Sequence, residues 1–159
     1  MRPRVGLTIG DPAGIGPEIL RAALASGKLP AEVDYEVIGE TDGFSLGEPT
    51  AESAQAARDA LEQAVKRALA GELAAVVTGP IHKARMYEIG FEFPGQTAFF
   101  AARCVVENFA MLLPGNGLTV ALVTTHVPVV EVPKHRRTSG TVRGCNLLGG
   151  SVDVRGGGV

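Results

Sequence analysis

The sequence predicts a three-layer α/β/α fold with a mostly parallel sheet. Short apolar runs that read as strands alternate with segments whose apolar residues recur every three or four positions. A glycine turn leads directly from the first strand into a helix. In proteins with this alternation, helices cover both faces of a parallel sheet. At 159 residues the chain is long enough to bury a sizeable core.

The first part of the chain predicts strand, helix and strand. The first strand is expected in RVGLTIG, residues 4–10, and ends in the glycine turn GDPAGIGPE. The helix in EILRAALASG carries apolar residues at helical spacing and should stop at Gly27. A second strand is expected in YEVIGE, residues 35–40.

The clearest helix lies in TAESAQAARDALEQAVKRALAGE, where Ala, Leu and Val recur every three or four residues. Thr50 or Ser53 could cap its start, and Gly71 should stop it. A buried strand, LAAVVTG, and a turn with a short helix, PIHKARMYEIG, are expected next. GQTAFFAARCVV should then be helical, and FAMLLP and LTVALVTTH should be strands.

Ligands of such sheets bind beyond the carboxyl ends of the strands. The loops after Thr8, Val77 and Val123 are therefore the candidate places for a site.

The predicted domains are a first α/β domain over residues 1–94, the start of a second over 95–134, and an atypical tail over 135–159. The tail is rich in glycine and arginine, contains no glutamate, and has no amphipathic period. It is interpreted either as a flexible segment or as translation in a shifted reading frame.

Composition narrows the class of protein. Hydrophobic residues make up 45% of the chain and charged residues 20%, and the formal net charge is -2. This balance predicts no nucleic-acid or membrane partner. No stretch has the length of a bilayer span or of a signal-peptide core, so a cytoplasmic protein is expected. Cys104 and Cys145 have no CxxC spacing, in agreement with a reducing compartment.

The string GDPAGIGPE is the most distinctive motif. Its glycines could bring backbone N–H groups close to an anion, Asp11 could accept hydrogen bonds, and Pro17 suits the first turn of a helix. The alternative is a tight turn without a ligand. Neither GxGxxG nor GxxxxGK[ST] occurs in the chain.

Two further strings carry candidate ligand-binding residues. In VVTGPIHK, Thr78 could donate a hydrogen bond and Lys83 could meet a phosphate, whereas His82 is better explained as a cap of the next helix. In FPGQTAFF, Gln96 and Thr97 stand at a helix start that suits a phosphate. N-capping explains Thr97 equally well.

His126 follows an apolar strand and precedes a proline in VALVTTHVP, as when a strand delivers a polar side chain to a cleft. Local chemistry alone favours a histidine at a strand end whose hydrogen bonds are satisfied within the protein and that binds no ligand. Nothing in the chain resembles a Ser/His/Asp triad, and no catalytic residue is assigned.

Four strings, GDPAGIGPEI, GELAAVVTGPIHK, GFEFPGQTAFF and VALVTTHVPVVEVP, occur in an order that resembles the 4-hydroxythreonine-4-phosphate dehydrogenase family of vitamin B6 biosynthesis. The resemblance runs from about Arg4 to about Pro133 and covers the amino-terminal half or less of a family member. It implies a fold like that of the isocitrate and isopropylmalate dehydrogenases and a homodimer whose site lies between two domains.

The implied reaction is NAD- or NADP-dependent oxidation of 4-phosphooxy-L-threonine, a small phosphorylated hydroxy amino acid, followed by decarboxylation. A divalent metal (zinc, magnesium or cobalt) held by three histidines is implied as well. His126 matches the first of these ligands, whereas the NPHAGE and YHDQG strings that carry the others are absent.

The substrate-binding string GHT appears as Gly95, Gln96 and Thr97, and glutamine cannot become a cation. This departure affects phosphate binding or the choice of substrate. Because a single histidine does not hold a divalent ion tightly, the short chain is expected to be inactive by itself. The alternative function is a non-catalytic fragment that binds ligand weakly or self-associates.

Overall fold

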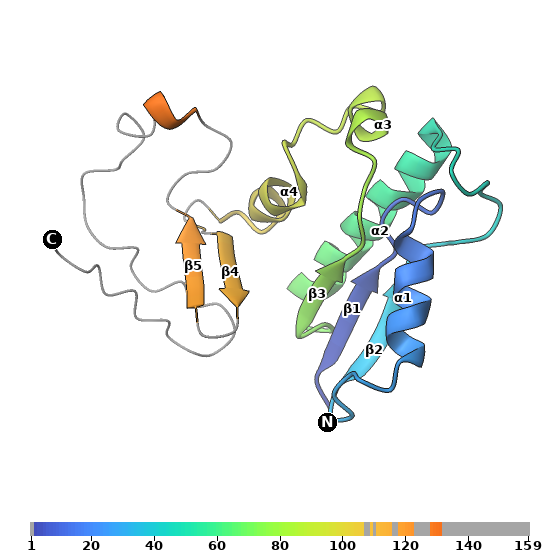
Figure 1. Ribbon diagram of the computed structural model, residues 1–159, viewed down its shortest axis with the longest axis vertical. Helices are drawn as coiled ribbons and strands as arrows, with labels where there is room; N and C mark the ends of the chain where they lie inside the picture. The colour runs from blue at the N-terminus through green and yellow to red at the C-terminus, as the bar shows by residue number, and fades with distance from the viewer. Residues whose placement is uncertain (1, 107–108, 110, 116–117, 123–127, 132–159) are drawn as a thin grey trace, which may run out of the picture. The chain divides into compact units, whose positions relative to one another are not determined.

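The computed structural model describes residues 2–106, 109, 111–115, 118–122 and 128–131. The chain divides into two compact units, Met1–Val105 and Val106–Val159. Figure 1 labels the helices and strands of both units, and each unit is described by itself.

The first unit is built on a three-stranded parallel sheet. Its strands β1 (Arg4–Thr8), β2 (Asp34–Ile38) and β3 (Ala75–Thr78) lie in the order β2-β1-β3. Thr8, the last residue of β1, is aligned with Ile38 on one side and Thr78 on the other. The carboxyl ends of all three strands therefore meet at one edge of the sheet, and the three predicted strands are confirmed.

Two helices cover the two faces of this sheet. Helix α1 (Gly16–Ala25) connects β1 to β2, and helix α2 (Ala51–Leu69) connects β2 to β3. The connection from β1 to β2 and the connection from β2 to β3 run in opposite directions across the sheet. Because both connections are expected to be right-handed, the two helices lie on opposite faces, as Figure 1 shows. Leu20 of α1 and Ala60 and Ala64 of α2 belong to one core with the strand residues Leu7 and Ile38.

The predicted start of α2 is confirmed in detail. The Thr50 hydroxyl accepts a hydrogen bond from the Ser53 N–H at 3.2 Å, and the Ser53 hydroxyl accepts one from the Thr50 N–H at 3.0 Å. This reciprocal capping box satisfies two N–H groups that a helix end otherwise leaves unpaired.

A second core fastens two short helices to α2. Helix α3 (Lys83–Glu88) contributes Met86, and helix α4 (Gln96–Arg103) contributes Phe99, which is fully buried. Phe91 and Phe93 pack against Phe99 with ring centroids 5.5 and 5.4 Å away. Large aromatic side chains bury much apolar area, so this cluster holds α4 in place.

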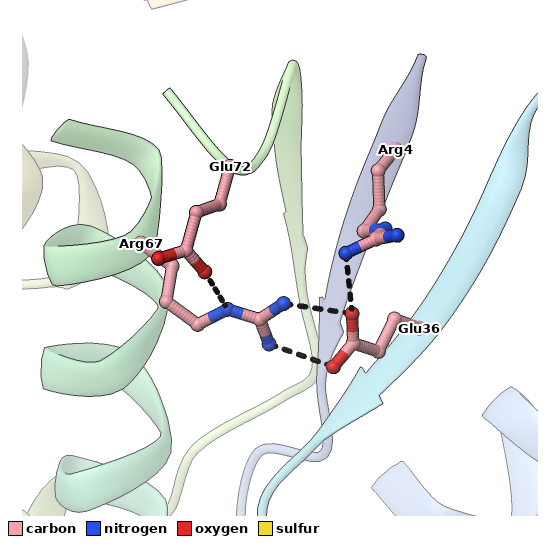
Figure 2. Close-up of polar contacts among 4 residues, drawn as sticks. All are labelled: Arg4, Glu36, Arg67 and Glu72. Carbon is pink, nitrogen blue, oxygen red and sulfur yellow. Dashed lines mark hydrogen bonds and ion pairs between the residues drawn. The ribbon is translucent and has the colours of Figure 1, made fainter. Parts of the chain in front are cut away.

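An ion-pair network joins α2 to the sheet toward the amino ends of the strands. Figure 2 shows that Arg67 of α2 contacts both oxygens of Glu36 on β2, at 2.7 and 2.8 Å, and Glu72 at 3.0 Å. Arg4 of β1 lies 3.9 Å from Glu36. The hydrogen bonds from Arg67 hold the pKa of the Glu36 carboxyl below its usual value. This network is structural and lies away from the carboxyl-end loops.

The second unit contains strands β4 (Met111–Gly115) and β5 (Leu118–Leu122) and the 3₁₀ turn η1 (Val129–Glu131). β4 and β5 pair antiparallel, with Met111 opposite Leu122. Only two residues separate the strands, which is too short a connection for a parallel crossover. His126 lies outside the described residues.

No helix in the described part of the chain is both long and apolar enough to cross a bilayer.

Candidate functional site

The loops after β1 and β3 lie in direct backbone contact because the two strands are neighbours. The Asp11 N–H donates to the Pro80 carbonyl at 2.8 Å, and the Gly79 N–H donates to the Thr8 carbonyl at 2.8 Å. Gly10 has a φ of +72°, and a Cβ built there would lie 2.2 Å from the Pro80 oxygen. Glycine is therefore required at position 10 for both its conformation and the close approach of the two loops.

Three N–H groups of the GDPAGIGPE string, those of Asp11, Ala13 and Gly14, donate within the protein. The Ala13 N–H donates to Asp11 Oδ1 at 2.9 Å, and the Gly14 N–H donates to the Asp11 carbonyl at 3.0 Å. Asp11 itself is only 3% exposed. These bonds show that residues 10–14 form a tight turn. The amino end of α1, in the second half of the string, has no side-chain cap among the described residues.

Polar side chains from three segments meet at the carboxyl end of β3. The Thr78 hydroxyl donates to Gln96 Oε1 at 2.6 Å, and Gln96 Nε2 donates to the Gly79 carbonyl at 2.8 Å. The neighbouring Thr8 hydroxyl is fully buried and has no hydrogen-bond partner among the described residues. Gln96 thus connects the start of α4 to the end of β3, which is where a ligand of a parallel sheet binds.

The amino end of α4 has no side-chain cap. Its N-cap residue is Gly95, in extended backbone, and Thr97 is the second residue of the helix. The alternative interpretation of Thr97 as the N-cap is therefore wrong, because the N-cap of α4 lies two residues earlier, at Gly95. Without a side-chain cap, the first N–H groups of the helix are available to an anion.

A cation lies beside this helix end. Lys83, the first residue of α3, is exposed, and its Nζ lies 3.9 Å from the position that a Cβ of Gly95 would occupy. No ion pair of Lys83 occurs in the part of the chain that the structure describes. An ammonium group and a helix amino end both attract negative charge, so together they suit an anionic group such as a phosphate.

His82 has the capping role that the sequence favoured. Its Nδ1 accepts a hydrogen bond from the Arg85 N–H at 3.3 Å, which makes it the N-cap of α3. The cap lies one residue before Lys83, the first residue of α3. His82 therefore acts on the site through the position of Lys83.

A metal centre cannot be assembled from the described residues. No group of three His, Cys, Asp or Glu side chains able to hold an ion occurs among them. His126, the ligand that the family resemblance implies, lies outside these residues, so its role stays a prediction.

Gln96, Thr97, Thr78 and Lys83, all singled out in the sequence, come together at one edge of the first unit. The bond between Thr78 and Gln96 could not be found by sequence reasoning, because 18 residues separate the partners. No periodicity or motif signals a contact at that separation. Likewise, no sequence signal indicated that the Thr8 hydroxyl would lack a hydrogen-bond partner within the described part of the chain.

Solved structures share the fold of the chain. A 4-hydroxythreonine-4-phosphate dehydrogenase from Klebsiella pneumoniae matches with a TM-score of 0.66 at 24% identity, over 83% of this chain and 54% of that chain. One from Burkholderia phymatum matches with a TM-score of 0.68 at 23% identity, over 84% and 53%. The chain thus has the α/β fold of these structures, and the fold class expected from the sequence, that of the isocitrate and isopropylmalate dehydrogenases, is confirmed.

The family model described as "Pyridoxal phosphate biosynthetic protein PdxA" matches residues 18–154, and the chain belongs to this family. The match extends past Pro133, where the resemblance of the quoted strings ends, and includes most of the glycine- and arginine-rich tail.

Curated relatives in this family are named 4-hydroxythreonine-4-phosphate dehydrogenase. The Synechocystis relative is 35% identical over 173 residues, which cover 83% of this chain and 50% of the relative. The Thermosynechococcus vestitus relative is 36% identical, over 82% of this chain and 49% of the relative.

The chain spans about half the length of the curated relatives that it matches. The alignment with the Synechocystis relative is 173 positions long, which is more than the whole length of this chain, although it covers only 83% of the chain's 159 residues. The Synechocystis relative therefore also has residues within the matched span that have no counterpart here.

Proposed function

We propose that the chain forms part of a dehydrogenase that oxidises and decarboxylates 4-phosphooxy-L-threonine in pyridoxal phosphate biosynthesis. Membership of the family and the names of the curated relatives support this proposal. The single observation that carries it is the uncapped amino end of α4, which lies beside Lys83 and contains Gln96 and Thr97.

In the proposed site, this arrangement binds the phosphate of the substrate. The first N–H groups of α4 and the Thr97 hydroxyl donate to phosphate oxygens, and Lys83 balances their charge. Gln96 adds a neutral amide donor where the GHT string of the family has histidine. Binding of the phosphate would fix the position of the substrate relative to the carboxyl edge of the sheet.

NAD or NADP is the proposed hydride acceptor, and a divalent metal such as zinc, magnesium or cobalt would, when bound, polarise the hydroxyl that is oxidised. Of the three histidine ligands implied by the resemblance, this sequence contains His126 alone. Metal sites need several protein ligands in fixed geometry. We therefore propose that the 159-residue chain binds substrate without turnover.

Titration calorimetry with 4-phosphooxy-L-threonine tests the proposed phosphate site. Lys83→Gln should weaken binding about tenfold or more, because it removes a charge-assisted contact. Lys66→Gln is the matched control, because Lys66 is an exposed lysine on α2, and it should leave the affinity unchanged. Equal effects of the two substitutions would mean that the lysine on α3 is not part of the site.

The absence of turnover needs a separate measurement. The chain should form no NADH from 4-phosphooxy-L-threonine in the presence of a divalent metal. NADH formation that His126→Ala abolishes would show that the chain is active and that this part of the proposal is wrong.

A homodimer is the proposed assembly, and a cytoplasmic location remains part of the proposal. Self-association would cover Val37 and Val77, two sheet residues that are 42% and 52% exposed. Sedimentation at high concentration tests it, and a monodisperse monomer would count against a dimer.

A further inference from the structure

We propose that Thr78 is a positioning residue that holds the Gln96 amide in its orientation at the phosphate site. The inference rests on the proposed function, since it concerns how Gln96 meets the substrate. It begins from two hydrogen bonds, from the Thr78 hydroxyl to Gln96 Oε1 at 2.6 Å and from Gln96 Nε2 to the Gly79 carbonyl at 2.8 Å.

The chemistry of the partners allows only one orientation of the amide. The Gly79 carbonyl can only accept, so the NH₂ group of Gln96 must face it. The other end of the amide, Oε1, can only accept, so the Thr78 hydroxyl must donate to it. A flipped amide would place Oε1 against the Gly79 oxygen and lose that hydrogen bond, whereas the Thr78 hydroxyl could accept a hydrogen bond from Nε2 instead.

This orientation decides what Gln96 can offer a phosphate. Each amide has two N–H donors, and the bond to Gly79 uses one, so one N–H remains for an anion. If the amide flipped, its oxygen would take the place of that donor and repel the phosphate oxygens. The Gly79 carbonyl therefore selects the orientation in which Gln96 attracts the substrate, and the Thr78 hydroxyl holds the other end of the amide in that orientation.

The held amide also distinguishes this chain from relatives with GHT. A histidine at position 96 changes its charge near neutral pH, whereas an amide stays neutral. The contribution of Gln96 to phosphate binding should therefore not vary with pH, apart from the titration of the phosphate itself.

The test compares Thr78→Val, which keeps the shape but removes the hydroxyl, with Thr78→Ser, which keeps the hydroxyl. The first measurement needs no ligand. In ¹H–¹⁵N spectra of the full chain, the signals absent from Gln96→Ala identify the Gln96 side-chain amide. Thr78→Val should speed the exchange of these amide protons with water and bring their shifts together, and Thr78→Ser should preserve the wild-type signals.

The second measurement is the affinity for 4-phosphooxy-L-threonine. Thr78→Val should weaken binding about five- to tenfold, the effect of one net hydrogen bond. Thr78→Ser should bind with the affinity of the wild-type chain, because it keeps the hydroxyl. In a Gln96→Ala background Thr78→Val should have no further effect, because a positioning residue acts only through Gln96.

The outcomes separate this inference from the proposed function. Unchanged Gln96 amide signals in Thr78→Val overturn the positioning role, as does an additive loss of affinity in the double variant. A Gln96→Ala chain that binds substrate with wild-type affinity overturns the phosphate-binding role of Gln96. In that case the ligand-free spectra still decide whether Thr78 orients the amide.

Discussion

Replacing Gly10 by alanine should destabilise the chain far more than the same change at Gly27, although the two glycines have similar φ values, +72° and +66°. At Gly27 a Cβ meets nothing within 4 Å. At Gly10 it lies 2.2 Å from the Pro80 oxygen and 2.7 Å from the Gly79 carbonyl carbon. The pair therefore separates the cost of backbone conformation from the cost of loop packing.

The magnitudes follow from these two costs. A left-handed alanine costs about 1–2 kcal/mol, which is the whole effect expected for Gly27→Ala. Gly10→Ala adds about 1–3 kcal/mol for the overlap with backbone that must move. It adds about 1 kcal/mol more for the hydrogen bond from Asp11 to Pro80 that the movement breaks. We expect about 4 kcal/mol in total for Gly10→Ala.

Gly79→Ala tests the packing cost without the conformational one. Gly79 is not in the left-handed region, but a Cβ there would lie 2.5 Å from the Ile9 oxygen. An intermediate loss of about 2–3 kcal/mol is expected.

Urea denaturation followed by far-UV circular dichroism measures all three variants against the wild-type chain. Surface substitutions often change the free energy of unfolding by about 0.5 kcal/mol. If the losses of unfolding free energy in Gly10→Ala and Gly27→Ala agree within that amount, the packed contact between the loops after β1 and β3 is refuted.

Three further changes test other parts of the first unit. Thr8→Val should stabilise the chain by about 1 kcal/mol, because it removes a buried hydroxyl without a partner among the described residues; a loss of stability in urea would show that the hydroxyl has one. Thr50→Ala should cost about 1 kcal/mol by removing the cap of α2, and an unchanged urea midpoint would contradict the capping box. Glu36→Gln should weaken the pH dependence of stability in acid. Arg67 lowers the pKa of Glu36 below its usual 4.5, so this stabilisation is present above pH 4.5 and is lost as the pH falls through the lowered pKa. Free energies of unfolding measured above and below that pKa test this prediction. If the unfolding free energy of Glu36→Gln depends on pH as steeply as that of the wild type, the pair of Arg67 and Glu36 has no role in the pH dependence.

The candidate site was predictable in its members but not in their contacts. The position of Gln96 and Thr97 at a helix start, and of Lys83 just past a buried strand, followed from motifs a few residues long. The interpretation of GDPAGIGPE remained open between an anion loop and a tight turn. The structure shows the tight turn through bonds within the loop and through the contact of Asp11 with Pro80, and no local pattern contains that contact.

The sequence by itself determined the order of strands and helices in the first unit, the cap of α2 and membership of the family. It could do so because hydrophobic period, capping residues and short motifs act over a few neighbouring residues. Only the tertiary structure decided that Gly10 and Gly79 bring two loops into contact and that Thr78 holds the amide of Gln96. Residues far apart in sequence meet there because β1 and β3 are neighbours in the sheet and the aromatic core fastens α4 beside them.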